Sequence, residues 1–226
     1  MKLIPRYFLI IGLCIFRLLP ALAQLPVRQE PRHKMVLENE YIRLFDVHIA
    51  PGDTTLYHIH AMPSVVVIIT KSTIGTQVYH KPPSRPGEVL PGSTSFIDYG
   101  SHPLTHRVWN QGSDTFHVMD IELLRKPLAL DSCPVLYQPY LRFAWEQKMF
   151  RVYNMEIPGG QECDLQASRC GHLLVVIKGT VFSVPDKRSI QSVKQLKTGQ
   201  YFWIPPRSTA DISANSDAEC VLLELK

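Results

Sequence analysis

Two histidines one residue apart, His58 and His60, are the residues whose type and spacing most directly indicate chemistry. Side chains alternate between the two faces of a β-strand, so an extended His58-Ile59-His60 segment presents both imidazoles on one face. Imidazole nitrogens are common ligands of divalent transition metals, and two neighbouring imidazoles supply half of a four-coordinate site. Such pairs also arise by chance, so a metal site requires a further ligand elsewhere in the chain.

A third histidine, His106, opens the segment 106–110, which reads as a short strand leading to a turn. If this strand and the His58 strand both line the interior of a barrel, the three imidazoles converge. Three neutral ligands leave coordination positions open, as catalytic metal sites do. Iron, manganese, zinc, nickel and copper all accept such ligands, so the expected cofactor is a divalent transition metal of unspecified identity.

The segments around these histidines have the pattern of short β-strands. Residues 41–49 alternate apolar and polar side chains, and residues 65–69 form a continuous apolar run. The proline-rich stretch 81–92 reads as a loop. No long stretch has the 3.6-residue period of an amphipathic helix. The sequence therefore predicts an all-β fold, closed as a barrel or stacked as a sandwich.

The pattern of the first half recurs in the second half. The segment that ends at Gly159 repeats the alternation and the Pro-Gly ending of the segment that ends at Gly52. Gly92 and Gly199 are separated by the same offset, 107 residues. Matching features at one offset indicate an internal duplication, so we expect two barrels in tandem.

The length of 226 residues accommodates this arrangement, and the apolar fraction of 45% is ordinary for globular cores. We expect five consecutive segments: a signal peptide over 1–23, an N-terminal arm over 24–34, a metal-binding barrel over 35–124, a linker over 125–141 and a second barrel without metal over 142–226.

The first 23 residues have the organisation of an export signal. Lys2 and Arg6 precede an apolar run, and Ala21-Leu22-Ala23 fits the cleavage pattern, with cleavage after Ala23. We therefore expect a secreted or periplasmic protein with no stable membrane anchor after cleavage. The net charge of +4 is scattered, without a basic run, so no nucleic-acid partner is indicated.

Cleavage would remove Cys14 and leave four cysteines, which allow three pairings. An oxidising compartment permits disulfides. Cys163 and Cys170 are close in sequence and could bridge a turn. Unpaired buried thiols are the alternative.

The histidine motifs resemble those of the cupin superfamily. Gly52, five further residues and then His58 and His60 match its first motif, and His106 followed by Asn110 matches the end of its second. The resemblance covers about residues 35–124 and, more weakly, 142–226. It implies a bicupin, in which two small β-barrels follow one another.

Ser64 departs from the family pattern, because the family usually has a glutamate ligand there. Strand alternation places Ser64 on the face of His58 and His60, where it could be a weak or water-mediated fourth ligand. The resulting neutral three-histidine centre is similar to those of cupin dioxygenases that act on thiols or diketones.

The second barrel departs further from the family pattern. Leu165 and Ala167 fall at the two histidine positions of the first motif, His172 falls near the glutamate position, and Asp211 falls near the third histidine. One histidine and one carboxylate do not make a metal site, so we expect a structural barrel.

Two function classes remain open. One is a metal-dependent dioxygenase, similar to the quercetin-dioxygenase-like cupins, acting on a small chelating substrate at His58, His60 and His106. The other is a non-catalytic protein that binds a metal or a small-molecule ligand. A carboxylate that reaches the metal from another strand would favour the enzyme. A monomer or a homodimer is expected, since such barrels pair through sheet edges.

The remaining histidines offer no further ligand on spacing alone. His102 precedes Pro103 in a loop and is expected at the surface. His48, His80 and His117 have no partner at ligand spacing.

Overall fold

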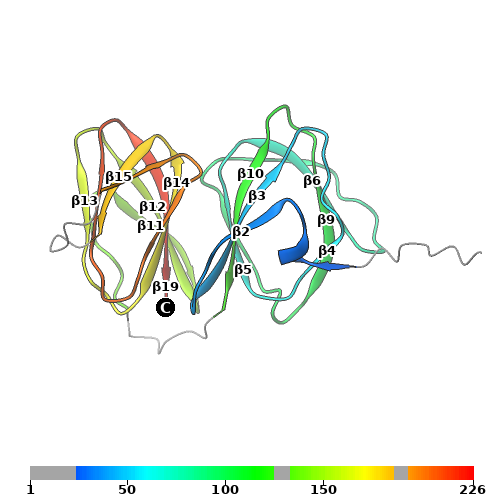
Figure 1. Cartoon of the computed structure of the whole chain (residues 1–226), viewed down its shortest axis with the longest axis horizontal. Helices are drawn as coiled ribbons and strands as arrows, with labels where there is room; N and C mark the ends of the chain where they lie inside the picture. Colours follow the sequence, from blue (N-terminus) through cyan, green and yellow to red (C-terminus); the bar gives the residue numbers. More distant parts are fainter. Residues whose placement is uncertain (1–23, 125–132, 186–192) are drawn as a thin grey trace, which may run out of the picture.

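The computed structural model describes residues 24–124, 133–185 and 193–226, which form two β-barrels side by side (Figure 1). The expected signal peptide and residues 125–132 of the expected linker lie outside this part. Within it, the only helical element is the single 3-10 turn η1, Val27–Gln29. No helix among the described residues has the length and hydropathy to cross a membrane.

Two five-stranded sheets form the first barrel. One has the order β1-β4-β9-β6-β7, with the bounds β1 Leu25–Pro26, β4 His58–His60, β6 Ser72–Val78, β7 Gly87–Val89 and β9 Leu104–Asn110. The other has the order β2-β3-β10-β5-β8, with the bounds β2 His33–Glu38, β3 Ile42–Ile49, β5 Ser64–Ile68, β8 Thr94–Ile97 and β10 Phe116–Leu123.

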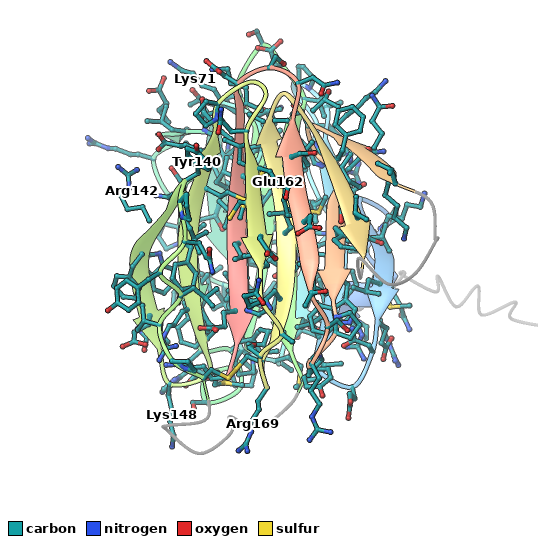
Figure 2. The ribbon with its side chains drawn as sticks, turned by 90° about the vertical axis from the view of Figure 1, so that its left-hand side faces the viewer. Lys71, Tyr140, Arg142, Lys148, Glu162 and Arg169 are labelled. Carbon is teal, nitrogen blue, oxygen red and sulfur yellow. A yellow bond between two sulfur atoms is a disulfide. The ribbon has the colours of Figure 1, made fainter. Side chains whose placement is uncertain are left out.

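The second barrel repeats this plan. Its five-stranded sheet has the order β11-β12-β19-β14-β17, with the bounds β11 Leu141–Gln147, β12 Phe150–Ile157, β14 Gly171–Lys178, β17 Tyr201–Ile204 and β19 Ala218–Leu225. Its four-stranded sheet has the order β13-β18-β15-β16, with the bounds β13 Glu162–Leu165, β15 Thr180–Pro185, β16 Lys194–Lys197 and β18 Ala210–Ala214. Figure 2 shows this barrel from outside, where exposed side chains such as Arg142 and Glu162 lie.

The apolar run of β5 is explained by burial on both faces. Val65 and Val67 belong to a core that the two barrels share, whereas Val66 and Ile68 pack inside the first barrel. A strand covered on both sides reads as a continuous apolar segment rather than an alternating one. The predicted buried strand therefore marks the wall between the barrel interior and the partner barrel.

The sheet β2-β3-β10-β5-β8 of the first barrel packs against the sheet β11-β12-β19-β14-β17 of the second barrel through this shared core. Leu44 and Ile121 of the first barrel and Val152 and Leu223 of the second are fully or almost fully buried in it. The indole N–H of Trp145 in the second barrel donates a hydrogen bond to the Thr94 hydroxyl of the first barrel. Burial of apolar side chains is the main stabilising contribution in a domain interface, so the two barrels form one packed unit.

A row of alternating charges on three neighbouring strands occurs once in each barrel and supports the predicted duplication. In each row an arginine binds a glutamate on either side, and cross-strand register pairs all three residues; the rows are Glu38–Arg43–Glu122 and Glu146–Arg151–Glu224.

The disulfide joins Cys133 to Cys170, with 6.1 Å between their Cα atoms, so of the two alternatives left open for Cys163, a bridge to Cys170 or an unpaired buried thiol, the second holds. The Cys163 side chain points from β13 into the core of the second barrel, where it is fully buried as a free thiol. Cys170 precedes β14 and is bonded to Cys133, which lies within the expected linker 125–141. Cys220 is the second buried free thiol of the described residues.

Candidate metal centre

The structure brings His58, His60 and His106 together inside the first barrel. His58 and His60 are buried on the same face of β4, while Ile59 between them is partly exposed. His106 of β9 lies directly opposite His58 in the strand register. The ring centroid of His58 is 4.9 Å from that of His60 and 4.8 Å from that of His106, and His60 and His106 are 5.0 Å apart.

A fourth histidine, His33, joins them from the start of β2. Its ring centroid lies 4.6 Å from that of His58. One ligand nitrogen each of His33, His58 and His60 lies within 4.8 Å of the others, so these three buried residues can hold a metal ion. We refer to His33, His58, His60 and His106 as the central histidine cluster. His33 was missed because it sits in a polar, non-periodic segment that the sequence places in the N-terminal arm.

The segment before β2 positions His33. β1 pairs in parallel with β4, with Leu25 opposite His58, and η1 then turns the chain towards the cluster. Glu30 follows η1 and is almost fully buried. Its carboxylate accepts a hydrogen bond from Nδ1 of His33 at 2.8 Å and one from the Leu56 N–H at 3.2 Å. This carboxylate–imidazole contact leaves Nε2 of His33 as the atom that can bind a metal.

The Glu30 carboxylate is held in its charged form. Burial opposes its ionisation, but the hydrogen bond and charge of His33 and the backbone N–H groups of Arg32 and Leu56 outweigh burial and lower the pKa to about 2. A charged carboxylate behind a ligand imidazole raises the basicity of the ligand and fixes its orientation.

The other imidazoles also turn a free nitrogen inward. Nδ1 of His58 donates to the carbonyl oxygen of Leu56 at 2.8 Å, and Nδ1 of His106 lies 3.3 Å from the Thr76 hydroxyl. Nε2 of His58 and Nε2 of His106 are buried and have no hydrogen-bond partner among the described residues. Buried polar atoms without partners are costly. These lone pairs therefore fit a divalent transition metal, which neutral imidazoles bind well.

Burial keeps these imidazoles neutral. Burial lowers the pKa of His58 to about 4, with the charge of His33 adding to the effect. Burial likewise lowers the pKa of His106 to about 3 and that of His60 below its ordinary value. Metal ligation requires the deprotonated ring, so these three histidines are in the ligand form at neutral pH.

A carboxylate reaches the cluster from another strand. Asp120 of β10 is buried, and its Oδ2 lies 3.5 Å from Nδ1 of His60. Burial raises the pKa of Asp120 to about 6. Ser64, which stands where the cupin pattern usually has a glutamate and which could be a weak fourth ligand, is fully buried, and its hydroxyl donates to the Met62 carbonyl oxygen. The acidic group thus comes from β10 rather than from β5.

An apolar cavity of about 490 Å³ adjoins the central histidine cluster. Its polar part consists of His33, His60, His106, Tyr99 and Asp120 beside the cluster, and of Glu88, Ser93, Thr94 and Ser95 along β7, β8 and the segment between them. Most of the rest of its wall is aliphatic or aromatic, with Val47, Ile49, Val66, Ile68, Ile74, Val89, Leu90, Val108, Phe116 and Val118. The ring of Tyr99 stacks on His60 at 4.7 Å.

Tyr57, Tyr79 and Arg107 lie outside this cavity wall. The hydroxyl of Tyr57 donates to Gln77, and its ring packs against Tyr79 with centroids 5.1 Å apart. The guanidinium of Arg107 lies over the Tyr57 ring and donates to Gln77. These residues form a packing group on the outer side of the sheet. His102 is exposed in a loop, as expected.

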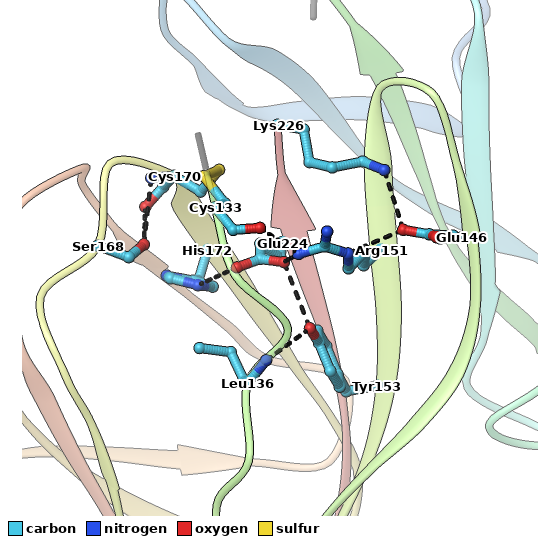
Figure 3. The surroundings of a disulfide bond; sticks show 10 residues. All are labelled: Cys133, Leu136, Glu146, Arg151, Tyr153, Ser168, Cys170, His172, Glu224 and Lys226. Atoms are coloured by element: carbon cyan, nitrogen blue, oxygen red, sulfur yellow. Dashed lines mark hydrogen bonds and ion pairs between the residues drawn. A yellow bond between two sulfur atoms is a disulfide. The ribbon is translucent and has the colours of Figure 1, made fainter. Parts of the chain in front are cut away.

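The second barrel replaces the histidine cluster with a buried charge network. His172 occupies the position equivalent to Ser64 and lies opposite Glu224 in the register. Nη1 of Arg151 lies 3.0 Å from the Glu224 carboxylate, and Nε2 of His172 lies 3.6 Å from it (Figure 3). The Cys133–Cys170 disulfide covers this network, and Arg151 also donates to the Cys133 carbonyl oxygen.

The register corrects the position predicted for Asp211. Leu165, the equivalent of His58, lies opposite Ala210, so Ala210 stands at the third-histidine position. Asp211 is one residue out of phase, lies opposite Asp164 and is directed away from the core that contains Ala210 and Ile212. Alternation along β18 therefore removes the second barrel's only predicted carboxylate ligand from its interior.

No family model and no curated protein matches the chain. Among solved structures, AerE from Microcystis aeruginosa has a TM-score of 0.56 at 13% identity, over 87% of this chain and 98% of AerE. YhhW from Escherichia coli has a TM-score of 0.58 at 14% identity, over 86% and 89% of the two chains. The fold is that of a bicupin.

A salicylate 1,2-dioxygenase from Pseudaminobacter salicylatoxidans shares this bicupin fold. Its TM-score is 0.58 at 10% identity, over 82% of this chain and 71% of the enzyme. A likeness at such low identity shows the fold and not the activity. What this protein does must therefore be argued from the central histidine cluster and the cavity beside it.

Proposed function

We propose that the first barrel of this bicupin is a metal-dependent dioxygenase that acts on a small, largely apolar substrate with a chelating head group. The observation that carries the proposal is the set of buried imidazole nitrogens without partners, placed at one part of an apolar cavity. The fold likeness to a salicylate dioxygenase supports the same class.

The central histidine cluster supplies the proposed ligand set. His33, His58 and His60 form its compact part, and His106 adds a fourth imidazole from β9. Four imidazoles, each neutral once it binds a metal, leave about two positions of an octahedral ion open. The bound metal would supply Lewis acidity and bring a chelating substrate and oxygen together. An anionic head group suits a site whose ligands carry no charge.

The cavity selects the rest of the substrate. Its largely aliphatic wall favours an aromatic or branched apolar body. Leu90 and Ile97, both partly exposed, line it beside β7 and β8, where the substrate would enter. Phenolic acids, enols and diketones of small size fit both requirements.

Asp120 and Tyr99 are the chain's own groups for handling the head group. The Asp120 carboxylate is beside His60 and faces the cavity, where it can accept a hydrogen bond from a substrate hydroxyl. The Tyr99 hydroxyl belongs to a ring that stacks on His60 and so keeps that imidazole in place. The carboxylate favours the enzyme over a purely metal-binding protein.

Elemental analysis of the purified full chain is the first test, with His58→Ala and His106→Ala beside it. We expect a transition metal at the central histidine cluster of the wild type, and the metal content of both variants should fall by one equivalent per chain. Oxygen uptake with hydroxybenzoates, flavonols, diketones and thiols then tests the activity. Unchanged metal content in both variants would overturn the site. Metal bound without oxygen uptake on any substrate class would favour a binding protein.

A further inference from the structure

A second group of metal-ligating side chains lies on the first barrel, outside the cavity. Asp46 and His48 are two residues apart on β3, and His117 of β10 lies opposite His48 in the register. Nε2 of His48 and Nε2 of His117 lie 2.9 Å and 2.7 Å from the same carboxylate oxygen, Oδ1 of Asp46. We refer to these three residues as the Asp46 cluster. His48 and His117 thus have partners that linear spacing alone did not reveal.

The two imidazoles are stacked and converge on one point. Their ring centroids are 4.0 Å apart with an interplanar angle of 24°. One ligand atom from each of Asp46, His48 and His117 lies within 4.8 Å of the others. In tetrahedral zinc sites with bonds of about 2.0–2.1 Å, ligand atoms are about 3.3 Å apart. A shift of about half an ångström would open the Asp46 cluster to that geometry.

The charge balance of the cluster also suits a cation. In the described part of the chain, the ion pairs of Asp46 are formed with the two imidazoles, which are charged only when protonated. The equivalent positions in the second barrel are Asn154, Glu156 and Glu219. There Arg142 binds Glu156 at 3.1 Å and Lys178 binds Glu219 at 3.0 Å. Among the described residues, no lysine or arginine forms an ion pair with Asp46, although Lys34 lies opposite it in the register of β2 and β3.

The Asp46 cluster is open to solvent on one side and packs against the second barrel on the other. The His48 side chain is 50% exposed and that of Asp46 is 25% exposed, so solvent and ions reach the cluster. His117 is 13% exposed and lies against the β16–β17 turn of the second barrel, where a side chain at Gly199 would overlap its ring. The least exposed ligand is therefore held in place, while the outer imidazole can adjust.

We propose that Asp46, His48 and His117 form a second divalent metal site, of the zinc type, at the junction of the two barrels. Two imidazoles and one carboxylate are a sufficient protein ligand set, and water completes the coordination. The site lies outside the substrate cavity and does not depend on the central histidine cluster or on the proposed activity.

Zinc titration of the full chain against a chromophoric chelator tests the proposal. His48→Gln and Asp46→Asn, which preserve side-chain size, should each weaken one zinc-binding event at least tenfold and lower the bound zinc by one equivalent per chain. His117→Gln should have the same effect. His80→Gln is the matched control, because His80 lies outside both clusters, and it should bind zinc as the wild type does.

The readout separates the two sites. Variants of the Asp46 cluster should leave the metal of the central cluster in place, and His58→Ala should leave zinc binding at the Asp46 cluster unchanged. Unaltered zinc stoichiometry and affinity in His48→Gln and Asp46→Asn would overturn the proposal. If circular dichroism shows that His117→Gln does not fold, the His48→Gln variant still tests the proposal, because the His48 side chain is half exposed.

Discussion

Ser64 and His172 occupy equivalent positions in the two barrels, and each lies opposite a glutamate on the neighbouring strand, Glu122 for Ser64 and Glu224 for His172. A small serine leaves room beside it, and Asp120 of β10 places a carboxylate in that region of the first barrel. The larger imidazole fills the space in the second barrel. The equivalent position therefore borders the central histidine cluster in the first barrel and belongs to a buried charge network in the second.

Glu30→Gln should weaken metal binding at the central histidine cluster about 10- to 100-fold, as loss of a partner behind a ligand histidine commonly does. The amide keeps the size of the carboxylate but removes the charge that holds Nδ1 of His33. Metal competition titration measures the effect. Glu38→Gln is the control, since Glu38 is paired with Arg43 away from the cavity. Equal affinities for both variants would mean that Glu30 does not support a ligand.

Ser64→Glu should lower the melting temperature, because it adds a second buried carboxylate near Asp120, and like charges in a buried site repel. Ser64→Glu combined with Asp120→Ser should recover both stability and metal content, since one carboxylate would again face the cluster. Thermal unfolding and elemental analysis of the two single variants and the double variant form a cycle. Strict additivity of the two changes would show that the positions do not share one role.

Arg151→Met should destabilise the protein by about 3–5 kcal/mol, because it leaves the Glu224 carboxylate buried without its cation. Glu224 is fully buried and Arg151 nearly so. Arg142→Met breaks a pair with Glu156 that is exposed on both sides, and it should change the free energy of unfolding by less than about 1 kcal/mol. Urea unfolding compares the two. Similar losses in both variants would contradict the buried network.

Cys163 and Cys220 should make the protein less stable as pH rises from about 9 to about 11. Burial, with a neighbouring carboxylate adding to it, raises the pKa of Cys163 to about 11 and that of Cys220 to about 12. In this range the unfolded chain has lost the thiol protons that the folded chain retains, so stability falls with rising pH.

Urea unfolding at pH 8 and pH 10.5 checks this slope, with a Cys163→Ala and Cys220→Ala double variant as the comparison. The double variant should lose less stability between the two values. In the native wild type, iodoacetamide at pH 8 should modify neither thiol. Peptide mapping without reduction should recover Cys133 linked to Cys170, and rapid alkylation of Cys163 in the folded chain would contradict its burial.

Much of the fold and part of the site could be predicted from periodicity and register. Strand alternation placed His58 and His60 on one face, and the constant offset of glycines revealed the second barrel. These signals are local or repeat along the chain. His33 gave no such signal, because β1 and η1 bring it to the cluster through contacts with β4 that no pattern in the polar segment encodes.

The other features that the sequence did not predict depend on contacts between segments that are distant in sequence. Asp120 sits in a strand buried on both faces, so its alternation did not distinguish a cavity residue from a core residue. Cys133 meets Cys170 only after the chain has formed three strands of the second barrel. His48 finds His117 through cross-strand pairing. Each required the tertiary arrangement before the relationship existed.

The shared core between the barrels has a consequence for how the protein behaves on dilution. The sheets that meet there belong to one chain, so their association is intramolecular and does not depend on protein concentration. A pair of separate single-barrel chains would dissociate when scarce. Covalent fusion also allows the two copies to diverge, so that one keeps its histidines while the other keeps only the shared core. The repeated rows of glutamate and arginine mark what both copies still share.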